Sequence, residues 1–176
     1  MPPFLKLFHL FLRTMQFLFV ILVLALSGAL IQQQDRGGSP TRVNYSIFVA
    51  AFAALTHLYL FPATLVDKIA SPLAMAALDF LDAVFFLCAG IAMAAQLGGR
   101  PCSGYVYLHS NGITNGGGYE SPHRRCREAD AMTAFEWFAF AAFAASFLVD
   151  LWNYKREREG ARSRVGGRGA RGMGQV

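Results

Sequence analysis

The hydrophobic residues of this chain lie in four long runs, separated by shorter stretches that hold most of the charged side chains. At a rise of about 1.5 Å per residue, a helix of roughly 20 apolar residues crosses a hydrocarbon core about 30 Å thick. Each run has little of the polar face that an amphipathic helix of a soluble protein carries. The pattern therefore predicts four membrane-spanning helices, at residues 14–31, 45–66, 73–97 and 131–152.

Two other interpretations of these runs fit less well. Transmembrane β-strands alternate apolar and polar residues over about ten positions, and these Ala- and Leu-rich runs do not alternate. The first run follows Lys6 and Arg13 and ends near small residues, as a secretory signal does, but signal h-regions have about 7–15 residues. We therefore expect a retained first helix and an all-α bundle of four membrane helices.

The composition agrees with a membrane protein and divides the chain into three parts. Hydrophobic residues make up 55% of the sequence and charged residues 15%, whereas a soluble domain has about 25% charged residues. We expect a cytoplasmic N-terminal segment at residues 1–13, a membrane domain at 14–152 and a disordered basic tail at 153–176. The basic side chains of this tail are Lys155, Arg156, Arg158, Arg162, Arg164, Arg168 and Arg171.

The basic tail also suggests an orientation. Positive residues near membrane ends favour the cytoplasm, and an even number of spans places both termini on one side. Residues 32–44 and 98–130 then form the two outer loops. Close to the membrane, the arginines of these two loops are nearly as numerous as the positive residues on the side of the termini. Charge alone therefore does not decide the orientation.

The cysteines favour the same orientation. Cys102 and Cys126 lie near the two ends of the second outer loop, and a disulfide between them would persist only on an oxidising face. Closing this loop is expected to stabilise the fold by about 3 kcal/mol. A zinc site with His109 and His123 is the rival reading, but its ligands are spaced more widely than in usual zinc motifs. Two free thiols are the remaining alternative, and Cys88 is expected to be buried in the third span.

The second outer loop has the composition of an irregular segment. Asn111-Gly112 and Asn115-Gly116 are turn signals. Residues 105–108 alternate weakly, which suggests a short hairpin. Asn44 begins a glycosylation sequon, but it adjoins the second span and is expected to lie too near the bilayer for modification.

Five ionisable residues lie within the predicted spans. Asp79 and Asp82 are three residues apart, so they share one face of the third helix. His57 of the second span is expected at nearly the same depth as Asp82. Glu136 lies in the outer half of the fourth span, too far away to meet Asp82 directly. Asp150 lies near the cytoplasmic end of that span, from where its side chain can extend to water.

Two hypotheses account for these intramembrane residues. In the first, His57, Asp82 and Asp79 form a proton or substrate relay. In the second, they bond across helices and fix the packing of the bundle, which contributes about 0.6–2 kcal/mol per contact. Transport paths usually need broken helices or repeated halves, and only Pro62 interrupts a span. We favour the packing hypothesis.

Particular residues also suggest a family. Arg13-Thr-Met-Gln16 opens the first span, and residues 124–140 (RRCREADAMTAFEWFAF) lead from the cysteine-containing loop into an aromatic last helix. Together with the acidic third span, they resemble fungal MARVEL-domain proteins of the non-classical export group associated with eisosomes, over residues 6–152. The resemblance implies a four-helix bundle with cytoplasmic ends. It also implies organisation of plasma-membrane domains, a response to sphingolipid or membrane tension, or help in unconventional export.

The sequence thus predicts a non-enzymatic, multi-pass plasma-membrane protein that gathers lipids and partner proteins, including further copies of itself. Its basic tail is expected to hold anionic lipids, at about 1 kcal/mol for each Lys or Arg near the surface. A small proton-coupled transporter or channel is the alternative. The chain has no recognisable catalytic, cofactor-binding or metal-ligand motif, and no nucleic-acid partner is expected.

Overall fold

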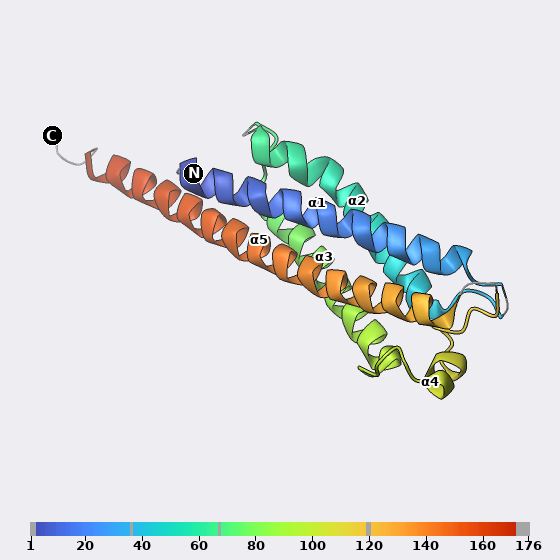
Figure 1. Cartoon of the computed structure of the whole chain (residues 1–176). Helices are drawn as coiled ribbons and strands as arrows, with labels where there is room; N and C mark the ends of the chain where they lie inside the picture. Colours follow the sequence, from blue (N-terminus) through green and yellow to red (C-terminus); the bar gives the residue numbers. More distant parts are fainter. Residues whose placement is uncertain (1–2, 36, 67, 119–120, 172–176) are drawn as a thin grey trace.

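The computed structural model describes residues 3–171 except Arg36, Asp67 and residues 119–120, and it leaves out the side chains of Pro3, Glu157 and residues 161–171. The described residues form five helices and no strand. The helices are α1 (Pro3–Gln32), α2 (Thr41–Leu65), α3 (Pro72–Leu97), α4 (Tyr105–Ser110) and α5 (Pro122–Arg171) (Figure 1). Four of them, all but α4, are long and apolar enough to cross a membrane. The prediction of an all-α, four-helix membrane bundle is confirmed.

Proline and glycine mark the ends of these helices. Pro72 follows the N-cap Ser71 of α3, and Pro122 follows Ser121 at the start of α5. Proline suits the first turn of a helix because its missing N–H would have no partner there. Gly98 ends α3 in the left-handed conformation, with φ of 62°, which a residue without a Cβ adopts at little cost.

The four long helices pack as a ring in which α1 contacts α2 and α5, and α3 contacts α2 and α5. We call the end of the bundle with the start of α1 and the α2–α3 turn the terminal end, and the opposite end, with α4, the loop end (Figure 1). α3 and α5 share the largest interface, and α2 and α3 share the smallest. The start of α1 and the end of α5 therefore lie toward the same end of the bundle (Figure 1).

The first helix differs from its predicted span. α1 begins at Pro3, so most of the predicted N-terminal segment 1–13 belongs to the helix. The basic residues Lys6 and Arg13 made this stretch resemble a flanking segment. Arg13 and His9 are instead buried inside the bundle, where they contact Asp79 and Asp150 of other helices.

The last helix is longer than predicted at both ends. α5 runs from Pro122 to Arg171, so the stretch 153–171 that we expected to be disordered is helical. At about 1.5 Å per residue, 50 residues extend well beyond a single crossing, and α5 projects past the other helices at the terminal end (Figure 1). Lys, Arg and Glu, which fill residues 155–159, have good helix propensity, and a helix already formed in the bundle extends without a new nucleation step.

The second loop also differs from the prediction. Residues 105–108, expected as part of a hairpin, lie in the short helix α4. Its residues bond locally, with the Leu108 amide donating to the Gly104 carbonyl. Tyr107 Oη donates to the Leu97 carbonyl at 3.0 Å, which fixes α4 beside the end of α3. Partial burial raises the pKa of Tyr107, so the phenol stays protonated and available as a donor.

Candidate functional site

A buried ion pair between α1 and α3 is the centre of a polar cluster in the terminal half of the bundle. Arg13 and Asp79 both have no solvent exposure. The two terminal nitrogens of Arg13 donate to the two carboxylate oxygens of Asp79, at 2.5 and 2.7 Å. This bidentate geometry is the strongest and most directional arrangement of the two groups. It therefore fixes both the depth and the rotation of α1 relative to α3.

Asp150 of α5 adds a third helix to this ion pair. Arg13 Nη2 lies 3.3 Å from Asp150 Oδ2, and His9 Nε2 lies 3.2 Å from Asp150 Oδ1. The expectation that Asp150 extends outward to water is wrong, because its side chain is only 1% exposed. The Asp150 side chain turns inward because Arg13 and His9 of α1 offer it charged and polar partners there, which replace its contacts with water.

Neutral polar side chains continue the cluster toward the membrane centre. Gln16 accepts from Arg13 at 3.0 Å and donates to Ser146 Oγ at 2.8 Å and to the Ala142 carbonyl at 3.0 Å. Thr56 of α2 donates to Asp82 Oδ2 of α3 at 2.7 Å. The cluster thus contains one or more residues from each of the four long helices.

Asp82 and His57, which the relay hypothesis joins, do not bond to each other. His57 is buried, and its Nδ1 lies 3.0 Å from the Ala53 carbonyl of its own helix. Its Nε2 and the second oxygen of Asp82 make no hydrogen bond among the described residues. The His57 ring instead contacts Phe143, edge to face, at 5.5 Å between centroids. The structure brings Asp79 and Asp82 into one cluster, but with Arg13 and Thr56 as partners.

Glu136 stands apart from the cluster. It has no solvent exposure, faces Ser46 of α2, and neither carboxylate oxygen makes a hydrogen bond among the described residues. Phe86 and Phe143, stacked at 5.6 Å between centroids, lie one helical turn from Asp82 and Ser146 toward the loop end. This aromatic layer separates the cluster from Glu136.

His9, Asp79 and Asp150 each have a ligand atom within 4.8 Å of the others, which is close enough for a metal ion. The guanidinium of Arg13 already occupies both oxygens of Asp79 and approaches Asp150. A divalent cation would have to displace it and would then lie beside a permanent positive charge. The arrangement is therefore that of an ion-pair cluster, and it presents no nucleophile with an adjacent base.

A second buried arginine organises the loop end. Arg125 has no solvent exposure and donates to the Leu30 carbonyl at 3.0 Å, to the Ile113 carbonyl at 3.0 and 3.1 Å, and to Gln34 Oε1 at 2.8 Å. The side chain therefore connects the end of α1 and the loop after α4 to the start of α5. In the sequence it is one of the arginines of the second outer loop, and nothing there distinguishes it from Arg124.

The disulfide lies next to this arginine. Cys102 and Cys126 are bonded, with 5.8 Å between their Cα atoms, as the sequence predicted. Their sulfurs are consequently not available as the zinc ligands of the rival reading. Cys88 is the free cysteine and is exposed on the outside of α3, so the expectation that it is buried is wrong.

Basic and aromatic side chains gather where α5 leaves the bundle at the terminal end. Trp152 is 48% exposed, and the guanidinium of Arg156 lies 4.8 Å from its ring centroid. Arg158 lies 5.0 Å from the ring of Tyr154. Lys155 is exposed. The other predicted lipid contacts have side chains outside the described residues: Arg162, Arg164, Arg168 and Arg171.

Several residues of the cluster were missed in the sequence, although a signal was present. His9, Arg13 and Gln16 follow the spacing i, i+4 and i+7, which puts them on one face of an otherwise apolar helix. Ser146, Asp150 and Asn153 repeat the same spacing on α5. These two polar stripes face each other in the structure, so the spacing is the signal that identifies the cluster.

Comparisons with known proteins decide the family. Residues 4–149 match MARVEL, described as a membrane-associating domain. The chain belongs to the MARVEL family. It is 36% identical over 146 residues to a Schizosaccharomyces pombe protein named non-classical export protein 2 homolog, covering 82% of this chain and 77% of that protein. No solved structure matches the chain significantly.

Two further relatives have similar names. Non-classical export protein 2 of Saccharomyces cerevisiae is 37% identical over 143 residues, 81% of this chain and 79% of the relative. Non-classical export protein 102 of Candida albicans is 35% identical over 136 residues, 77% of this chain and 76% of the relative. The resemblance inferred from the sequence is confirmed, and the chain is a multi-pass membrane protein.

Proposed function

We propose that this protein is a non-enzymatic organiser of plasma-membrane microdomains, such as eisosome-like patches, with both termini in the cytoplasm. The observation that carries the proposal is that Arg13, Asp79 and Asp150, which are buried in the terminal half of the bundle, are paired with one another. Arg13 bonds to Asp79 and Asp150, and an aromatic layer closes the cluster toward the loop end. A bundle built in this way acts through its outer surface.

That surface has two parts suited to gathering membrane components. The sides of the bundle present large apolar residues to lipid, among them Phe48, Leu58 and Ile91. The extension of α5 presents Lys155, Arg156 and Arg158 next to aromatic rings that suit the membrane interface. Anionic cytoplasmic lipids are the proposed partners of this extension, with sphingolipids, other membrane proteins and further copies of the chain as partners of the sides.

A role in export is the other part of the proposal. The relatives from three fungi are named as non-classical export proteins. We extend that role to this chain as assistance to protein export through the organisation of membrane patches.

Imaging in yeast tests the proposal. The tagged protein is expressed in Saccharomyces cerevisiae that lacks non-classical export protein 2, its 37% identical relative. We expect discrete patches at the cell periphery. A triple substitution of Lys155, Arg156 and Arg158 to Gln should weaken the patches, because each basic residue near an anionic surface contributes about 1 kcal/mol. Arg124→Gln, which removes an exposed positive charge at the loop end, is the matched control. An even rim for the unchanged protein would contradict the proposal.

A second candidate function is proton transfer through the terminal half of the bundle. The observation that favours it is the absence of hydrogen bonds at His57 Nε2 and Asp82 Oδ1, both buried. Liposomes that contain the purified protein and an internal pH dye separate the two functions. Proton flux that disappears in Asp82→Asn and His57→Gln, with normal folding of both variants, would favour the transporter over the organiser.

A further inference from the structure

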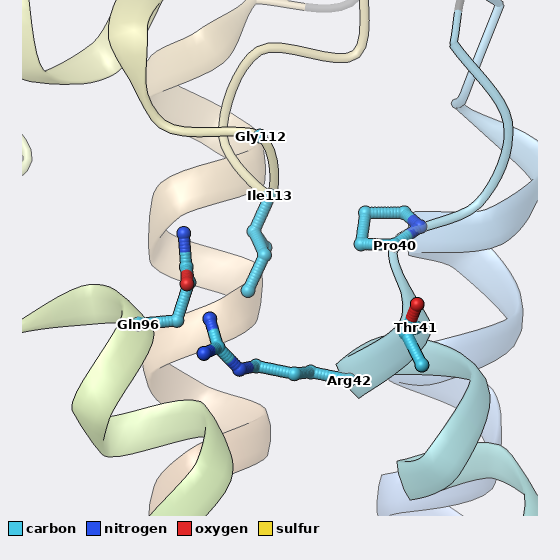
Figure 2. Close-up of a pocket in the computed structure, with 6 residues that line it drawn as sticks. All are labelled: Pro40, Thr41, Arg42, Gln96, Gly112 and Ile113. Atoms are coloured by element: carbon cyan, nitrogen blue, oxygen red, sulfur yellow. The ribbon is translucent and has the colours of Figure 1, made fainter.

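A crevice opens between α2 and α3 at the loop end of the bundle. Its volume is about 380 Å³, and Figure 2 shows the side chains that line it. These residues are Pro40, Thr41, Arg42, Gln96, Gly112 and Ile113. The crevice lies on the smallest interface between neighbouring helices of the bundle. In a membrane that the four long helices cross, a crevice at the end of α2 and α3 would adjoin both the headgroup region and the hydrocarbon of one leaflet.

Arg42 is the one charged residue among the six that line the crevice. Its side chain is exposed and extends from the first turn of α2 toward Gln96 of α3 (Figure 2). Its guanidinium has no ion-pair or hydrogen-bond partner among the described residues. The carbonyls at the end of α3 already have donors: Asn111 Nδ2 donates to Gln96 at 2.8 Å, and Tyr107 Oη donates to Leu97 at 3.0 Å. Within the described part of the chain, the positive charge therefore faces the crevice without an acceptor.

Aromatic rings line the seam between α2 and α3 on the side of the membrane centre. Phe85 of α3 lies 6.2 Å from Phe48 and 5.3 Å from Phe52 of α2, measured between ring centroids. Tyr45 stacks on Phe48 one turn closer to Arg42. Phe48 remains 53% exposed. An apolar surface thus continues from the charged crevice into the hydrocarbon region.

We propose that this crevice binds an anionic membrane lipid, whose phosphate accepts from Arg42 and whose acyl chains lie along Phe48, Phe52 and Phe85. A guanidinium matches two phosphate oxygens in a bidentate geometry, and the adjoining rings match the chains by apolar contact. This site is distinct from the basic extension of α5, since the two lie at opposite ends of the bundle and contact opposite leaflets. The headgroup phosphate of one lipid would lie at the charged part of the site, and its acyl chains would lie along the apolar part.

Native mass spectrometry of the full-length protein in a neutral detergent tests the proposal. The probes are dioctanoyl phosphatidylglycerol, dioctanoyl phosphatidylcholine and sodium phosphate. We expect saturable binding of one phosphatidylglycerol, weakened about tenfold in Arg42→Gln, because one charge-assisted contact is lost. Arg42→Lys, which keeps the charge but not the planar fork, should bind with intermediate affinity.

Arg100→Gln provides the matched control. It removes another arginine at the loop end, which stacks on Tyr107 instead of lining the crevice, and phosphatidylglycerol binding should be unchanged. Equal binding by Arg42→Gln and the unchanged protein would overturn the proposal, as would equal binding of phosphatidylcholine. If sodium phosphate at the same concentration displaced phosphatidylglycerol, the crevice would be a site for a free anion, and the proposal of a lipid would be wrong. If Arg42→Gln lowers the melting temperature, Arg42→Lys and Phe48→Ala replace it in the test. Both of these variants should also weaken lipid binding.

Discussion

Two arginines are fully buried at opposite ends of the bundle, and they are satisfied in different ways. Arg13, inside the terminal half, bonds to the carboxylates of Asp79 and Asp150. Arg125, at the loop end, donates to two backbone carbonyls and to the amide of Gln34. An ion deep in hydrocarbon needs a counter-charge because its solvation is lost, whereas neutral acceptors suffice near the headgroups.

The two arginines also differ in what they connect. Arg13 joins three long helices that are distant in the sequence, so it determines how the bundle packs. Arg125 joins the end of α1 and the loop after α4 to the start of α5, and the disulfide at Cys126 also attaches the outer loop to α5. Loss of Arg13 should therefore disturb the bundle as a whole, while loss of Arg125 should be buffered by the neighbouring covalent bond.

The largest effect is expected from Arg13→Met. The substitution leaves Asp79 buried without its counter-charge, which should lower the free energy of unfolding by about 3–5 kcal/mol. Equilibrium unfolding in mixed detergent and dodecyl sulfate measures this change. Combining it with Asp79→Leu should recover much of the loss, because no unpaired charge remains at that contact. Additive effects of the two substitutions would contradict the direct ion pair.

Removal of the disulfide should have the next largest effect. Cys102→Ser, or reduction of the protein, should lower the free energy of unfolding by about 3 kcal/mol, because the unfolded chain gains freedom. Cys88→Ser is the control, since this free thiol lies on the outside of α3 and should leave unfolding unchanged. Identical unfolding of oxidised and reduced protein would show that the bond does not hold the loop end.

Arg125→Gln should have a smaller effect than either change. The variant leaves buried carbonyls of Leu30 and Ile113 with fewer donors, at a cost of about 1–3 kcal/mol. The same unfolding measurement applies. Arg124→Gln is the neighbouring control, because its exposed pair with Glu128 should contribute less than about 1 kcal/mol. If Arg125→Gln lowered the free energy of unfolding as much as Arg13→Met, the two buried arginines would not differ in the way that we propose.

The smallest effect is expected from Asp82→Asn. The amide oxygen of Asn can still accept from Thr56, which donates to Asp82 at 2.7 Å, so the stability loss should stay under about 1 kcal/mol. Unfolding measured beside Asp79→Asn gives the comparison, since Asp79 bonds to a charged partner and should lose more. A reversed order would mean that Asp82 carries more of the packing than its contacts indicate.

The sequence predicted the elements well where one physical cause dominated. In lipid, backbone N–H and C=O groups must form hydrogen bonds within the protein, so four long apolar runs can form only helices or a closed barrel. The helices of the structure follow those runs. The bond between Cys102 and Cys126 followed from their positions at the ends of one loop. The extent of α1 was underestimated, because polar residues inside a bundle resemble flanking residues when the partner helix is unknown. The extent of α5 was underestimated because its polar continuation past the bundle has no apolar periodicity.

The sequence by itself determined the four membrane helices and favoured the covalent bond that closes the larger loop, because these depend on hydrophobic length and local spacing. Only the tertiary structure decided that Asp79 bonds to Arg13, that Asp150 turns inward, and that Arg125 is buried while Arg124 is exposed. Helical periodicity places a polar residue on a face, but which residues of another helix meet that face depends on how the helices rotate and cross.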